Sequence, residues 1–216
     1  MTRSGTRTAA ATLPWLVWRG VRVCWRELPR SAAAGAFFLA TAVPLTVAIV
    51  VAAPVAIIAA ATVPPSLALT GLARFAAATA RGDGPRLAAL RRIDPVLAAL
   101  LAGGVSLAAL ALAAGGAAEV GGAAGCAGLL LVFPYALAYG ALRDRRGLAA
   151  LRGGAILVAF RPSWALTLVA LGCLGGFAVA ASTGVLAAVA VPLLLAVTAS
   201  QTLGLLDEID ALQGRA

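Results

Sequence analysis

The sequence predicts an all-α membrane protein, a polytopic bundle of about six transmembrane helices in three hairpins, preceded by an interfacial amphipathic helix. Of its 216 residues, 62% are hydrophobic and 12% charged, and the mean hydropathy is +1.00. A soluble domain cannot bury that much apolar surface in one core. All 17 basic residues are arginines, and 16 of them form three clusters: Arg3 to Arg30, Arg74 to Arg92 and Arg143 to Arg161. Apolar runs between basic loops are typical of multi-pass proteins.

Residues 1–30 are expected to form a basic helix that lies in the plane of the lipid headgroups. Arginines interrupt the apolar stretch, so a signal peptide is excluded. At helical spacing the apolar face holds Trp18, Val21, Trp25 and Leu28, and the opposite face holds Arg19, Arg22 and Arg26. The predicted contacts with anionic headgroups are therefore Trp18, Arg19, Arg22, Trp25 and Arg26. A helix that binds a soluble partner and a disordered basic tail remain alternatives.

The uncharged segment from Ser31 to Ala73 is either one span or two spans joined near Ala52, Ala53 and Pro54. A single crossing would place ten arginines opposite the N-terminal cluster, against the positive-inside rule. A hairpin places all three clusters on the cytoplasmic face. We therefore expect six spans with both termini in the cytoplasm.

The other four spans follow from the length of about 20 apolar residues that a helix needs to cross the hydrocarbon core. They are Pro95 to Ala117, Gly121 to Leu142, Pro162 to Ala181 and Thr183 to Leu206. The transmembrane domain thus covers residues 31–206, and residues 207–216 form a short cytoplasmic tail. Close helix packing is expected at four small residues. These are Gly121, Gly125, Gly172 and Gly176.

Helix kinks are predicted at Pro65, Pro134 and Pro192, because proline removes a backbone donor inside a helix. In each second helix of a pair, the proline is followed six residues later by a small residue and nine later by a polar one. The three sets are Pro65, Gly71 and Arg74; Pro134, Gly140 and Arg143; and Pro192, Thr198 and Gln201. This is either a threefold internal repeat or a chance match within a sequence rich in alanine and leucine.

The sequence contains no recognisable catalytic site. Histidine is absent, the three cysteines are isolated, and neither a P-loop nor a dinucleotide fingerprint is present. No acidic residue falls within a predicted span, which disfavours a proton-coupled pump. We expect no enzyme activity, no metal and no cofactor. Nucleic acid is excluded as a partner because the arginines flank apolar segments instead of lining one basic face.

The strongest candidates for a ligand cavity are three polar side chains within the spans: Tyr135, Tyr139 and Gln201. The two tyrosines are four residues apart and share a helix face. They could contact a ligand, although tyrosine near a membrane interface is an ordinary anchor. The acidic residues Asp207, Glu208 and Asp210 are expected to be solvated, with exposed pairing to Arg143, Arg145 or Arg146 as the alternative.

A resemblance to a known family covers most of the chain from Val63 onward. Its first element is the run VPPSLALTGLARFAAATARGD, and the later elements are FPYALAYGALRDRRGLAALRGG and AFRPSWALTL. These segments resemble the YesL-like family of small bacterial membrane proteins, in which the stretch before the first proline is usually shorter. The resemblance implies a location in the bacterial cytoplasmic membrane and an association with carbohydrate uptake.

Two functions follow from these observations. The first is an accessory or regulatory protein that binds subunits of a carbohydrate transporter, with its arginine-rich segments contacting lipid and partner. The second is a small secondary transporter or channel, in which kinked helices surround a site lined by Tyr135, Tyr139 and Gln201.

Overall fold

The computed structural model describes residues 18, 21, 22, 25, 27–84, 87–182 and 184–214, and every regular element in these ranges is a helix. Six helical segments are long and apolar enough to cross a membrane. The predicted all-α polytopic bundle is therefore confirmed. In chain order the helices are α2 (Leu28–Val50), α3 (Val55–Ala61), α4 (Val63–Arg81), the 3-10 helix η1 (Leu87–Arg91), α5 (Pro95–Ala114), α6 (Gly116–Arg143), α7 (Leu148–Phe160), α8 (Pro162–Ala181) and α9 (Ala187–Gln213).

The long uncharged segment folds as two spans, as the distribution of arginine predicted. Helix α2 ends at Val50, and the chain turns through Ala52, which has a φ of 49°. The returning span consists of α3 and α4, which together run over Val55–Arg81. A break at Thr62 separates the two helices.

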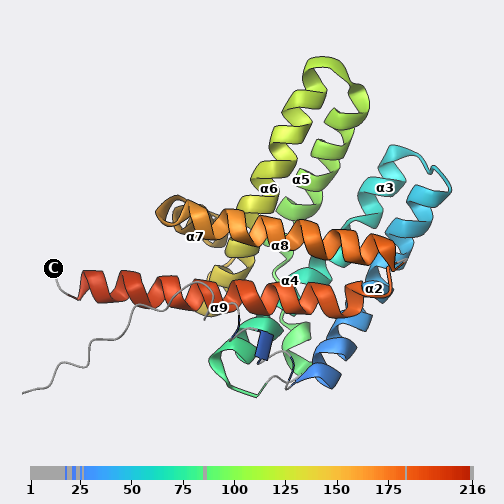
Figure 1. Ribbon diagram of the computed structural model, residues 1–216. Coiled ribbons are helices and arrows are strands. Elements are labelled where there is room, and N and C mark those ends of the chain that lie inside the picture. The colour runs from blue at the N-terminus through green and yellow to red at the C-terminus, as the bar shows by residue number, and fades with distance from the viewer. Residues whose placement is uncertain are drawn as a thin grey trace, which may run out of the picture.

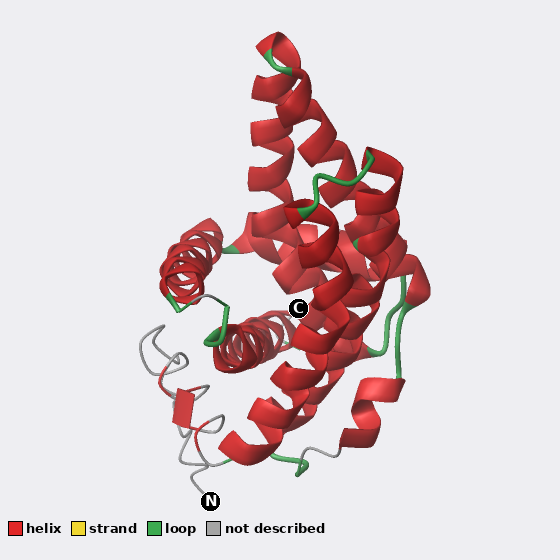
Figure 2. Cartoon of the chain, turned by 90° about the vertical axis from the view of Figure 1, so that its right-hand side faces the viewer, coloured by secondary structure: helices red, strands yellow, loops and turns green. Residues whose placement is uncertain are grey.

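The second hairpin, α5 and α6, turns at two glycines. Gly115 and Gly116 have φ values of 72° and 63°, in the left-handed region that glycine adopts without steric cost. Gly122 then allows the helices to approach closely, since a Cβ there would lie 2.9 Å from the backbone nitrogen of Leu112. Figures 1 and 2 show this hairpin rising away from the rest of the molecule.

The connection expected between the fourth and fifth spans is largely helical. Its helix α7 has 13 residues, about 20 Å of length, which is too short for a hydrocarbon core of about 30 Å. Two glycines fit α7 against α6: the ring of Tyr139 covers Gly153, and a Cβ on Gly154 would lie 2.5 Å from the backbone nitrogen of Ala136. The connecting segment is therefore an additional packed element that hydropathy alone did not reveal.

The third hairpin consists of α8 and α9, which run across the direction of α5 and α6 (Figures 1 and 2). Helix α9 is the central element, because 61% of the residues in its most apolar stretch of 18 residues are buried. It packs against α2, α4, α6 and α8. It also continues to Gln213, so the residues expected in a separate tail, 207–213, extend the last helix.

Candidate functional site

The predicted polar candidates Tyr135 and Gln201 meet in the centre of the molecule. The Tyr135 hydroxyl of α6 donates a hydrogen bond of 3.1 Å to Oε1 of Gln201 on α9. The two side chains are 1% and 0% exposed. Leu157, Trp164 and Val197 belong to the same apolar cluster as Tyr135. The pair is thus a direct contact between two helices inside a packed apolar core.

The amide of Gln201 has hydrogen-bonding capacity that this contact does not use. Its Nε2 atom is buried and has no hydrogen-bond partner among the residues that the structure describes. The neighbouring hydroxyls of Thr198 and Thr202 donate to carbonyls of their own helix, four residues earlier. A buried polar group without a partner costs about 1–3 kcal/mol. Gln201 is therefore a costly residue at this position for a purely structural core.

Tyr139 does not join Tyr135 and Gln201. Its ring lies over Gly153 of α7, and its side chain is only partly buried. One turn of helix separates the two tyrosines, but α7 covers Tyr139 and α9 covers Tyr135. The three predicted residues consequently form one bonded pair and one separate packing contact.

The predicted kink positions differ in their helical context. Pro134 and Pro192 lie inside α6 and α9. Pro65 lies in the first turn of α4, just after the break at Thr62, so the irregularity there is a helix boundary. The sequence reasoning did not single out Pro44, which lies inside α2.

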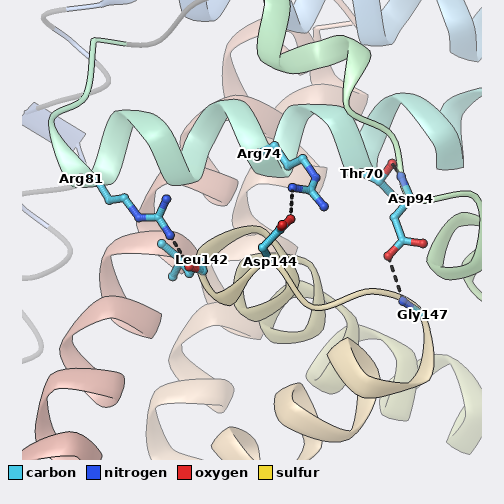
Figure 3. A network of polar contacts seen from close by, with 7 residues as sticks. All are labelled: Thr70, Arg74, Arg81, Asp94, Leu142, Asp144 and Gly147. Carbon is cyan, nitrogen blue, oxygen red and sulfur yellow. Dashed lines mark hydrogen bonds and ion pairs between the residues drawn. The ribbon is translucent and has the colours of Figure 1, made fainter.

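The most extensive polar contacts lie along α4 from Thr70 to Arg81, where the start of α5 and the end of α6 meet it, and sequence reasoning missed them (Figure 3). Asp94 is 4% exposed, and its Oδ1 accepts hydrogen bonds from the backbone nitrogens of Val96 and Leu97. Its Oδ2 accepts from Gly147 N at 2.9 Å, and its own backbone N–H donates to the hydroxyl of Thr70. One carboxylate therefore caps α5 and holds the loop that precedes α7.

Two arginines of α4 extend this network along the loop after α6. Arg74 binds Asp144 at 2.8 Å, and Arg81 donates to the carbonyl of Leu142. The hydrogen bond and positive charge of Arg74 lower the pKa of Asp144, which is held in a left-handed conformation with a φ of 49°. We call the seven residues drawn in Figure 3 the polar junction. They are Thr70, Arg74, Arg81, Asp94, Leu142, Asp144 and Gly147.

The polar junction brings the second and third arginine clusters to the same end of the helices, as the positive-inside rule predicted. Further ion pairs lie along α9. Arg143 binds Asp210 at 2.6 Å and Arg161 binds Glu208 at 2.6 Å. Asp210 thus follows the alternative of exposed pairing with Arg143, while the carboxylates of both pairs remain accessible to solvent. The partner of Glu208 is an arginine that the prediction did not consider.

The structure describes part of the predicted interfacial helix. Trp18 and Trp25 are 58% and 73% exposed, as residues that face lipid headgroups would be. The guanidinium of Arg22 lies over the ring of Trp18, 5.6 Å from its centroid. The prediction of opposite faces is therefore wrong for this pair, because a spacing of four residues places both on one side of a helix. Arg19 and Arg26 lie outside the described residues.

An open groove of about 660 Å³ runs along the α5–α6 hairpin. Its lining is apolar and rich in small residues, including Gly104, Ala108, Gly121, Gly125 and Gly128. A Cβ on Gly121 would meet no atom within 4 Å, and the same holds for Gly172 and Gly176 on α8. Within the described part of this chain no helix packs closely on these three glycines, whereas a Cβ on Gly125 would touch Ala108, so the groove side of α6 around Gly121 is uncovered.

No three metal-ligating side chains gather in the part of the chain that the structure describes. Cys126 is partly buried and Cys173 exposed, while Cys24 lies outside that part. Comparison of the chain with protein-family models, curated proteins and solved structures found no match. The resemblance to the YesL-like family and the function it implies therefore remain predictions.

Proposed function

We propose that this chain is a multi-pass accessory protein of the bacterial cytoplasmic membrane that binds and regulates a carbohydrate uptake system. The observation that carries the proposal is the closed polar centre. Tyr135 and Gln201 are bonded to each other and almost fully buried. A transporter needs its polar groups to face a solute pathway near the middle of the membrane. The association with carbohydrate uptake rests on the sequence resemblance.

The groove on the α5–α6 hairpin supports the accessory role, because a partner helix can approach small residues closely. Large apolar side chains of the hairpin are exposed, among them Leu107, Val120 and Leu130. In a membrane this surface contacts either lipid or another protein. If the chain is an accessory protein, this surface binds a helix of the transporter subunit.

The proposal is tested by purifying the tagged protein from native membranes in mild detergent and identifying bound proteins by mass spectrometry. We expect permease or ATPase subunits of a carbohydrate transporter in near-equal amounts. Recovery of the tagged chain alone, at several detergent concentrations and after cross-linking in intact cells, would contradict the proposal.

A pair of matched variants locates the contact. Gly121→Leu should reduce recovery of the partner, because the new side chain fills the groove without a clash inside this chain. Gly172→Leu is the control: its Cβ also meets no atom within 4 Å, but it lies on α8, outside the groove. Equal recovery with both variants would exclude the groove as the binding surface.

One observation favours the alternative, a small secondary transporter or channel. The unpartnered Nε2 of Gln201 could donate a hydrogen bond to a solute that enters when the helices separate. In that case Gln201→Leu should abolish uptake in reconstituted liposomes. In the accessory case the same variant should still recover the partner subunits.

The proposed orientation places both termini and the polar junction in the cytoplasm, in agreement with the positive-inside rule. Gly84 is exposed and follows the end of α4, so a reporter domain inserted after it should not disturb the packing. We expect the reporter to be cytoplasmic. An external reporter would overturn the orientation.

A further inference from the structure

Five exposed arginines have no hydrogen bond, ion pair or aromatic ring contact within the described residues. Four of them flank the polar junction in adjacent pairs, and the fifth lies on α7. They are Arg91, Arg92, Arg145, Arg146 and Arg152. Exposed guanidinium groups that lie close together create a positive potential, which attracts anions.

The hydrogen bond between Asp94 and Gly147 brings these pairs together in space. Arg91 and Arg92 lie three and two residues before Asp94, and Arg145 and Arg146 lie two and one before Gly147. The bond itself measures 2.9 Å and is buried. This hydrogen bond thus joins the segment before α5 to the segment before α7, and each segment carries one pair of arginines.

A second observation places three of these side chains near the carboxylates of the polar junction. Both Arg92 and Arg146 act electrostatically on the carboxylate of Asp144, in addition to its direct partner Arg74. Arg145 lines a small cleft together with Thr70, Arg74 and Asp94. Asp144 already pairs with Arg74. Among the described residues the carboxylates of Asp94 and Asp144 therefore balance only part of the positive charge of Arg74, Arg92, Arg145 and Arg146.

We propose that Arg92, Arg145 and Arg146 form a binding site for a phosphate group at the polar junction. Guanidinium groups recognise phosphate oxygens through charge-assisted, often bidentate hydrogen bonds. The arginines lie at the ends of membrane-spanning helices, the depth at which lipid headgroups occur. The phosphate belongs either to an anionic lipid headgroup or to a soluble phosphate compound. The site does not depend on the proposed transporter partner.

The test for a lipid uses the full chain purified in a non-ionic detergent. Native mass spectrometry measures how much phosphatidylglycerol the protein retains relative to phosphatidylcholine. Replacing two arginines in Arg92→Gln/Arg146→Gln should weaken phosphatidylglycerol binding about 30-fold, on the order of fivefold for each arginine. Arg152→Gln is the matched control and should bind as the unmodified chain does.

The test for a soluble ligand measures the thermal unfolding of the same variants with inorganic phosphate, and with chloride at equal ionic strength. A soluble ligand is identified if phosphate stabilises the unmodified chain, the double glutamine variant loses this stabilisation, and the unmodified chain shows no preference for phosphatidylglycerol. Arg92→Lys/Arg146→Lys retains the charge but not the bidentate geometry, so it should bind more tightly than the double glutamine variant and less tightly than the unmodified chain, which separates loss of the site from misfolding. The proposal is overturned if the double glutamine variant binds phosphatidylglycerol and inorganic phosphate as tightly as the control variant Arg152→Gln does.

Discussion

Because the buried carboxylate of Asp94 accepts three backbone hydrogen bonds, we expect Asp94 to contribute more to stability than a surface carboxylate does. Asp94→Ala removes the cap of α5, which costs about 1 kcal/mol. It also leaves the buried N–H of Gly147 without an acceptor, which costs about 1–3 kcal/mol more. The free energy of unfolding should therefore fall by about 2–4 kcal/mol in total.

The assay is reversible unfolding in mixed micelles of SDS and a mild detergent, followed by tryptophan fluorescence, since Trp164 belongs to a buried cluster. Asp83→Ala is the control, because Asp83 is exposed and its side chain has no hydrogen bond in the described structure. Asp94→Asn should fall between the two, because an amide supplies one acceptor oxygen instead of two. A change for Asp94→Ala within about 0.5 kcal/mol of the control would refute the reasoning.

Three further predictions concern the core and the second arginine cluster. Tyr135→Phe should lower the free energy of unfolding by about 1–3 kcal/mol because the buried Oε1 of Gln201 loses its hydrogen-bond donor; adding Gln201→Leu should restore the stability, and a double variant less stable than the single one would contradict this. Gly154→Ala should cost about 1–3 kcal/mol through overpacking against α6, and unfolding of the purified variant measures it; a gain in stability would show that α7 can shift. The pKa of Asp144 is lowered, so its ion pair stabilises the fold above the ordinary carboxyl range and the effect is lost as the pH falls through the lowered value. Arg74→Gln should raise that pKa toward its ordinary value, and an NMR titration of the Asp144 carboxyl group measures the change. A pKa that stays as low as in the unmodified chain would contradict the reasoning.

Charge and length were sufficient to predict the spans. The positive-inside rule required the first uncharged segment to cross twice, and the chain turns between Ala52 and Pro54, where the turn was expected. Helix α7 escaped prediction because it is apolar enough for a span and too short to be one. The boundaries of α9 also differed, because its charged residues form ion pairs on the helix and do not end it.

The candidate site was only partly predictable, because several of its contacts join residues that are far apart in the sequence. The spacing of four between Tyr135 and Tyr139 is a local property of one helix, and it indicated a shared face. Which neighbour covers each tyrosine depends on the packing of α7 and α9. Asp94 before Pro95 is a local signal for a helix start, which accounts for its capping role. Its bond to Gly147 spans 53 residues and has no local signature.

The recurring pattern of proline, small residue and polar residue has a physical basis in two of its three copies. The glycine in each lies against a carbonyl of the returning chain, with Gly71 under Leu90 and Gly140 under Arg145. Three residues later an arginine binds a carboxylate of another segment, as Arg74 and Arg143 do. In α9 the small position is Thr198, whose hydroxyl bonds within its own helix. Thr198 is nevertheless only 1% exposed, and the polar residue three positions later is the buried Gln201 of the central pair.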